Sequence, residues 1–192
     1  MPLPTVCRAL ALGTSLMASN LNATVIDGQI LRQSGQGSFV KLNTDTSFSV
    51  GNDSFDTDHL YAFDEDQNIA LSQDIRVDIS ANKDGLMGVI QAGTTVASHY
   101  VFFDSLSGIH IGTVYFDAPI LGIAAFQDTM AATDFLANTS VNYISEELRG
   151  LEQGDQVWID KDDPNRLWVY WAGSSPGDYI RVFTALSPAA MM

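Results

Sequence analysis

The residues best suited to chemistry are carboxylates gathered between positions 51 and 78. Eight acidic side chains fall in this stretch, and only His59 and Arg76 offset their charge. Like charges packed this closely repel one another unless a cation is present. Residues 64–68 read Asp-Glu-Asp-Gln-Asn, a spacing that brings alternate side-chain oxygens to one point, as calcium-binding loops do. The stretch is therefore a candidate calcium site.

This acidic stretch is not an EF-hand loop, because Ile69 stands where that loop needs glycine and Ile75 where it needs a bidentate glutamate. We predict instead a calcium site assembled from two loops, which clamps the strand ends of the domain. The six predicted ligands are Asp53, Asp56, Asp58, Asp64, Asp66 and Asn68. The alternative is a solvated acidic face, and a calcium titration of the melting temperature separates the two interpretations.

A second set of candidate residues is aromatic and lies on two predicted strands, residues 156–160 and 167–171. Because alternate side chains of a strand point to opposite faces, Trp168 and Tyr170 share one face while Trp171 points to the other. One face must be buried, and the other can form an exposed platform that stacks on sugar rings or on the apolar surface of a partner. Trp168 and Tyr170 are the candidate ligand-binding residues. The alternative is that core packing or the predicted helix covers them.

Catalytic signatures are weak in this chain. The histidines have no zinc-ligand spacing, and they are His59, His99 and His110. A carboxylate pair for glycoside hydrolysis can be drawn from four glutamates, but nothing in the sequence singles out two of them. These are Glu65, Glu146, Glu147 and Glu152. An enzyme is therefore the weaker expectation, and a non-enzymatic protein is favoured.

The composition excludes two classes of partner. The chain has 192 residues, of which 23 are acidic and 9 are basic, for a formal net charge of −14. A nucleic-acid binder needs a basic face, and a chain this acidic is repelled by nucleic acid and by anionic membrane surfaces. Hydrophobic residues make up 46% of the chain, enough for the core of one folded domain.

The first 23 residues have the pattern of a secretory signal peptide. Arg8 supplies a short basic region, residues 9–18 an apolar region, and residues 21–23 a small-residue exit. The alternative is a first buried helix, whereas a membrane span needs about 20 apolar residues, twice what this run offers. Cleavage would remove Cys7, the one cysteine. We therefore expect a secreted domain that is held by its core or by metal ions instead of disulfides.

From residue 24 onward the hydrophobic pattern mostly has a period of two, which predicts β-strands. The predicted strands cover residues 24–32, 38–42, 47–50, 60–63, 75–79, 94–103, 112–116, 120–125, 156–160, 167–171 and 179–184. Their spacing of roughly 8–12 residues, with turn residues between, is typical of a sandwich.

We predict an all-β fold, a mainly antiparallel and jelly-roll-like β-sandwich, as a single domain over residues 24–185 with a tail at 186–192. One short helix is expected over residues 128–138, because this segment has good helix formers, an Asp at its start and an Asn at its end. A weaker helical turn is expected at residues 145–148.

A series of ordered motifs runs over nearly all of the chain after residue 23. They are GNDSF at 51–55, LYAFDEDQN at 60–68, ASHYVFFD at 97–104, GTVYFDAPILGI at 112–123, TDFL at 133–136, LRGLE at 148–152 and SSPGDYIRV at 174–182. In this order they resemble a family of secreted bacterial proteins, most of which end in a PEP-CTERM sorting signal. The resemblance implies export and association with the cell surface or an exopolysaccharide matrix, usually without a known enzymatic activity.

The chain differs from that family at its end. Residues 185–192 contain no Pro-Glu-Pro motif, hydrophobic span or basic tail. The expectation is either a protein released without an anchor or a chain that stops short of the sorting segment.

These observations favour a secreted, non-enzymatic β-sandwich, stabilised by calcium, that binds extracellular polysaccharide or a surface protein. One alternative is a hydrolase of extracellular polysaccharide that uses a carboxylate pair. Another is a subunit of a surface assembly whose exposed strand edges pair with further copies.

Overall fold

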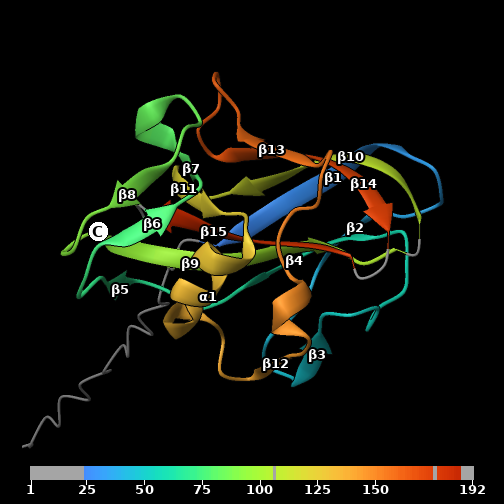
Figure 1. Cartoon of the computed structure of the whole chain (residues 1–192), viewed down its shortest axis with the longest axis horizontal. Coiled ribbons are helices and arrows are strands. Elements are labelled where there is room, and N and C mark those ends of the chain that lie inside the picture. The colour runs from blue at the N-terminus through green and yellow to red at the C-terminus, as the bar shows by residue number, and fades with distance from the viewer. Residues whose placement is uncertain (1–23, 106, 175–176, 187–192) are drawn as a thin grey trace, which may run out of the picture.

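A computed structural model describes residues 24–105, 107–174 and 177–186 of the chain (Figure 1). The predicted signal peptide, residues 1–23, and residues 187–192 of the predicted tail lie outside the described residues. The fold consists mostly of antiparallel strands with one short α-helix, so the all-β sandwich prediction is confirmed.

The first of the two large sheets has four strands in the spatial order β1-β10-β14-β13, and every neighbouring pair is antiparallel. Its strands are β1 (Val25–Gln33), β10 (Ser107–Phe116), β14 (Arg166–Ser174) and β13 (Gln156–Ile159). The predicted hairpin is present, because β13 pairs with β14 and Trp158 lies opposite Trp168. β13 is an edge strand of this sheet.

The second large sheet has the order β2-β4-β9-β15-β11-β7, with β5 also paired to β9. Its strands are β2 (Phe39–Lys41), β4 (Leu60–Asp64), β5 (Ile69–Ala70), β9 (Thr95–Phe103), β15 (Asp178–Ala185), β11 (Ile120–Ala124) and β7 (Ile79–Ser80). Only the pair β2–β4 is parallel among these neighbours. The edge strand β7 lies on the same side of the sandwich as β13, where a groove separates the two sheets.

Smaller elements cover the outer face of the second sheet. The short strands are β3 (Phe48–Val50), which pairs with β12 (Val141–Tyr143), and β6 (Ile75–Val77), which pairs with β8 (Gly88–Ile90). The helical elements are α1 (Gln127–Ala132) and the 3₁₀ turns η1 (Ala81–Lys83), η2 (Asp134–Leu136) and η3 (Glu146–Leu148). Figure 1 shows α1 in front of β9 and β15.

Two large hydrophobic clusters form the core of the described residues, one on each face of the second sheet. The cluster between the large sheets contains Val101 and Ile180 from one sheet and Trp171 from the other. The second cluster contains Phe102 of β9 and Met130 of α1. Because both faces of β9 and β15 are covered, these strands are buried along almost their whole length.

The helix is shorter than the predicted segment 128–138. It ends at Ala132, and a separate 3₁₀ turn follows. Two side-chain contacts divide the segment: Thr133 donates its hydroxyl back to the carbonyls of Thr129 and Met130, and Arg181 donates Nη1 to the Met130 carbonyl at 3.0 Å. Back-bonding of this kind competes with continuation of the helix.

The predicted strand at 75–79 is also divided, at Asp78. One carboxylate oxygen of Asp78 accepts the backbone N–H groups of Ala125 and Phe126, at 2.7 and 3.0 Å, and the hydroxyl of Thr129. Ala125 and Phe126 directly precede α1, and Thr129 lies in its first turn. Asp78 therefore fixes the chain where it enters α1, which begins at Gln127. The described residues contain no helix long and apolar enough to cross a membrane.

Candidate functional site

The outer face of the four-stranded sheet carries a stacked pair of tryptophans. Trp158 and Trp168 lie opposite each other on β13 and β14, with ring centroids 5.7 Å apart and ring planes at 3°. Leu167, Val169 and Trp171 point inward and are buried, which confirms the predicted division of β14 into two faces. The pair therefore forms an aromatic surface on the side away from the core.

Trp168 is held by the residues around it. Its indole Nε1 donates to Oδ2 of Asp160 at 2.6 Å, and the same carboxylate pairs with Arg166 at 2.8 Å. The guanidinium of Arg166 lies 5.7 Å from the ring centroids of both Trp168 and Tyr115. The hydrogen bond from Trp168 is the main cause that lowers the pKa of Asp160 below its usual range. Trp168 thus has a ring on one side and a cation on the other, and little of its face is left for a ligand.

Trp158 is the more accessible member of the pair. It stands on an edge strand and 38% of its surface is exposed, whereas Trp168 and Tyr170 are only partly exposed. The sequence prediction named Trp168 and Tyr170 as the ligand-binding residues, and the structure places Trp158 nearer to solvent than either. The signal that could have found it was the hairpin register, which sets Trp158 directly opposite Trp168.

A groove of about 480 Å³ separates the edge of the four-stranded sheet from the edge of the other large sheet. This size is in the range of small-ligand sites, which is 300–1,000 Å³. The groove is lined by Asp78, Ile79, Ala125, Phe126, Leu151, Asp155, Gln156, Val157 and Trp158. Phe126, which is 54% exposed, belongs to the side of the second sheet, and Trp158 to the side of the first.

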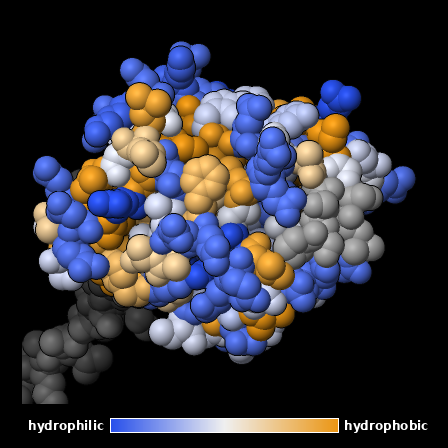
Figure 2. Space-filling model, viewed as in Figure 1, coloured by the Kyte–Doolittle hydropathy of each residue, from blue (hydrophilic) through white to orange (hydrophobic). Residues whose placement is uncertain are grey.

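Exposed apolar rings and polar groups are thus combined in one groove. Figure 2 shows hydrophobic residues as separate patches among hydrophilic ones on the face that carries α1. A groove that combines rings with polar groups suits ligands with both apolar faces and hydroxyl groups, because the rings stack and the polar groups fix orientation.

Two carboxyl groups meet beside this groove. Asp178, at the start of β15, is 2% exposed and forms a hydrogen bond with Asp155, which lines the groove. Burial raises the pKa of Asp178 to about 9, and the hydrogen bond with Asp155 and the charges of Asp155 and Glu152 add to the rise. Asp178 is therefore protonated at neutral pH and donates to the Asp155 carboxylate. Asp155 also accepts the backbone N–H groups of Ala172 and Glu152, at 2.8 and 3.0 Å.

The six residues of the predicted calcium site do not come together. Asp58 precedes β4, whose first residue pairs with Phe103, whereas Asp64 ends β4 and pairs with His99. At ~3.3 Å per residue, the length of this strand separates the two loops by about 13 Å. No group of three or more His, Cys, Asp or Glu side chains in the described part of the chain is placed to hold a metal ion. Calcium binding stays a prediction that the structure does not test.

Asp64 has partners for both of its carboxylate oxygens. Oδ1 accepts the backbone N–H of Val25 at 2.9 Å and lies 2.8 Å from Nδ1 of His99, while Oδ2 pairs with Lys41 at 2.7 Å and accepts the hydroxyl of Thr24. Burial works to raise the pKa of Asp64, but the hydrogen bonds and charges of these neighbours outweigh it and lower the pKa well below its usual range. This residue joins the start of β1 to β4 and β9.

The remaining predicted ligands serve turns and loop contacts. Asp53, Asp56 and Asn68 all have positive φ angles, between 54° and 59°, a conformation that Asp and Asn tolerate better than most residues. Asp58 accepts the Ser105 hydroxyl at 3.0 Å. In Asp66, burial and the charge of Glu65 raise the pKa of the side chain. Turn geometry therefore gives Asp53, Asp56 and Asn68 a structural role.

One further motif is present in the sequence at residues 173–177, which read Gly-Ser-Ser-Pro-Gly, the spacing of a hydrolase nucleophile elbow. Such an elbow joins a strand to a helix, whereas this segment joins β14 to β15. Residues 175–176 lie outside the described residues. The structural context for an elbow is therefore missing.

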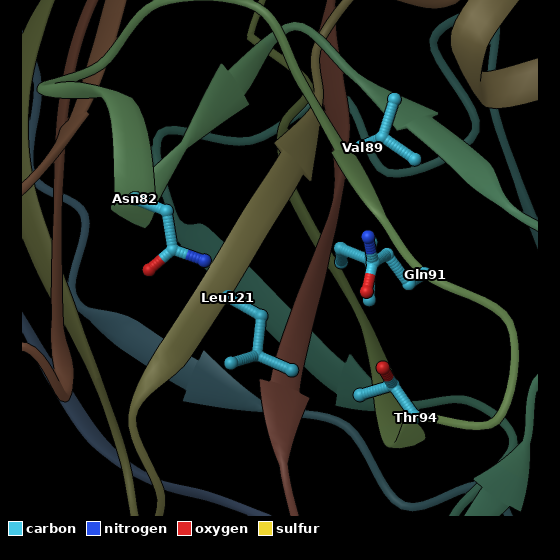
Figure 3. Close-up of a pocket in the computed structure, with 6 residues that line it drawn as sticks. Asn82, Val89, Gln91, Thr94 and Leu121 are labelled. Carbon is cyan, nitrogen blue, oxygen red and sulfur yellow. The ribbon is translucent and has the colours of Figure 1, made fainter.

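A second pocket, of about 340 Å³, lies between β11 and the segment around β8 (Figure 3). Its lining residues are Asn82, Val89, Ile90, Gln91, Thr94 and Leu121. Figure 3 shows the amide of Asn82 and the side chain of Gln91 on different sides of Leu121. No ionisable side chain lines this pocket, and its six lining residues include no aromatic ring, so it offers less chemistry than the groove.

Comparison with known proteins adds no assignment: no family model, curated protein or solved structure matches the chain.

Proposed function

We propose that this protein is an exported, non-enzymatic β-sandwich module that binds polysaccharide along the groove between its two sheets. The observation that carries the proposal is the exposed ring of Trp158, backed by Trp168 and accompanied in the groove by Phe126. Pyranose rings have apolar faces that stack on aromatic side chains, and Gln156 offers an amide to their hydroxyl groups. Export rests on the pattern of residues 1–23 and on the family resemblance of the motifs that follow them.

The proposal is tested by binding. Isothermal titration with soluble β-linked oligosaccharides measures the affinity of the wild-type protein and of Trp158→Ala. Loss of a central aromatic contact costs about 2 kcal/mol or more, so we expect a fall in affinity of about 30-fold. Phe135→Ala is the matched control, since Phe135 is an exposed aromatic residue outside the groove. Equal affinities of wild type and Trp158→Ala would exclude this groove as the binding site.

A polysaccharide hydrolase is the second candidate, and the pair formed by Asp155 and Asp178 is the observation in its favour. Two points weigh against it. Asp178 is buried and does not line the groove, and the two carboxyl groups are in direct hydrogen bond, closer than the ~5 Å or more that separates the carboxylates of glycosidases. Release of reducing ends from an oligosaccharide, abolished by Asp155→Asn without unfolding, would favour the hydrolase over the binding module.

A further inference from the structure

All the ionisable side chains that line the groove are acidic. Its two ionisable lining residues, Asp78 and Asp155, are both acidic, and Asp178 and Glu152 adjoin Asp155. At neutral pH the proton on Asp178 leaves the pair with Asp155 at a single negative charge. No lysine or arginine is among the residues that line the groove.

Four of the nine basic residues of the chain form ion pairs with acidic residues outside the groove. Arg181 and Arg149 pair with acidic residues beneath α1, Lys41 pairs with Asp64, and Arg166 pairs with Asp160 on the tryptophan face. The groove, which no lysine or arginine lines, therefore belongs to the surface of a chain with a net charge of −14.

From this charge pattern we infer the class of glycan, an inference that rests on the proposed function: the groove selects polymers of amino sugars with free ammonium groups over neutral and uronic-acid polymers. An ammonium group on a sugar stacked against Trp158 gains attraction to Asp155, whereas a uronate carboxylate is repelled by it. This attraction is electrostatic and acts between groups that are partly exposed to solvent, so it weakens as salt is added.

The test compares three soluble oligosaccharides: a β-1,4 glucosamine oligomer, the N-acetylglucosamine oligomer of the same length, and a galacturonate oligomer. Titration is carried out at a mildly acidic pH at which the sugar amines are protonated. We expect the glucosamine oligomer to bind about 5- to 10-fold more tightly than its N-acetylated form at low salt, and the two to approach each other at high salt. Galacturonate is expected to bind most weakly.

Gln156→Lys adds one positive charge to the groove without touching the core, because Gln156 is exposed on the edge strand and lines the groove. It is expected to lower the affinity for glucosamine by about 3- to 10-fold and to raise that for galacturonate. Gln156→Glu is the matched control and should act in the opposite direction.

Trp158→Ala distinguishes the groove from the acidic surface as a whole, because it leaves the charge of the protein unchanged. The inference is overturned if this variant keeps its affinity for glucosamine, or if the wild type binds the N-acetylated oligomer as tightly as the free amine. In the latter case the proposed polysaccharide-binding function still stands. Binding to none of the three oligomers would overturn both.

Discussion

Arg181 and Glu65 form a bidentate ion pair in which both side chains are fully buried, with Nε to Oε2 at 2.6 Å and Nη2 to Oε1 at 2.9 Å. The carboxylate of Glu65 also accepts the hydroxyl groups of Ser98 and Tyr143, each at 2.6 Å. Removing two ions from water is unfavourable, and their mutual attraction offsets this only when each ion also has good hydrogen-bond partners. Both ions of this pair have such partners.

The pair continues into a wider network under the helix. Nη1 of Arg181 donates to Oδ1 of Asp134 at 3.0 Å. The carboxylate of Asp134 also accepts hydrogen bonds from both terminal nitrogens of Arg149, at 2.7 and 2.6 Å. The network thereby ties β15 to η2 and to the residue after η3.

Glu65→Gln should be strongly destabilising, because it leaves the Arg181 guanidinium buried without its counter-charge. We expect a loss of about 3–5 kcal/mol in the free energy of unfolding, measured by urea denaturation. Glu146→Gln is the control, since the side chain of Glu146 is 58% exposed and its change should cost less than about 0.5 kcal/mol. A double change, Glu65→Leu with Arg181→Met, should recover much of the stability, and a double variant worse than Glu65→Gln would contradict this view of the pair.

The protonated side chain of Asp178 predicts a loss of stability at high pH. Its pKa is about 9 in the folded protein, above the ordinary value of a carboxyl group, so the folded state holds a proton that the unfolded state releases. Its contribution to the free energy of unfolding therefore falls as the pH rises from the ordinary carboxyl range toward 9. Asp178→Asn should remove this dependence and stabilise the protein at pH 7, by an amount of the order of 2–4 kcal/mol.

The measurement for Asp178 is urea denaturation at several pH values, compared with the wild type. Asp84→Asn is a matched control, because Asp84 is exposed and its positive φ suits asparagine as well as aspartate. Parallel pH profiles for wild type and Asp178→Asn would show that Asp178 is ionised in the folded protein.

Substitution of Asp64 distinguishes a structural role of this residue from a role in calcium binding. Asp64→Asn weakens the contacts with Lys41 and His99, and we expect it to cost about 2 kcal/mol in the free energy of unfolding. The lowered pKa of Asp64 adds stability above the ordinary carboxyl range, and that stability is lost as the pH falls through the lowered value. Both effects should be the same in EDTA and in calcium. A melting temperature that rises with calcium in the wild type, and not in Asp64→Asn, would instead support the predicted calcium site.

The hairpin and its faces could be predicted because β14 alternates strictly and only one of its faces is covered by the other sheet. Leu167, Val169 and Trp171 fall on the buried side as expected. The groove could not be predicted, because Asp78, Phe126 and Asp155 come from distant parts of the chain and meet only through the packing of the two sheets.

For a related reason, the spacing of charges along the sequence did not show where the predicted calcium ligands lie in the fold. The aspartates at 53–58 and those at 64–66 are close in sequence, yet a strand runs between them and carries them to opposite ends of a sheet. The ion pair of Glu65 could not be predicted from the sequence either, because its partner Arg181 is 116 residues away in the chain. The local sequence predicts turns and the alternation of buried and exposed residues along a strand. Ion pairs between residues so far apart in the chain depend on the order of strands in the sheet.

The stacking of Trp158 on Trp168 predicts that substitutions of Trp158, Trp168 and Tyr170 reduce oligosaccharide affinity by different amounts. Trp168→Ala removes the ring that supports Trp158, so we expect a loss of affinity for the bound oligosaccharide of about 3- to 10-fold, smaller than that of Trp158→Ala. Tyr170→Ala should change affinity less than either, because Tyr170 lies opposite Gln156 and is not among the residues that line the groove.

A double-mutant cycle between Trp158 and Trp168 checks this arrangement by titration calorimetry. Because Trp168 acts through Trp158, the double variant should bind no more weakly than Trp158→Ala alone, a departure from additivity that contacting residues show. Trp168→Phe, which keeps a ring for stacking, should restore most of the affinity. Additive losses would mean that Trp168 contacts the sugar directly, as the sequence alone suggested, and would move the binding surface from the groove onto the outer face of the sheet.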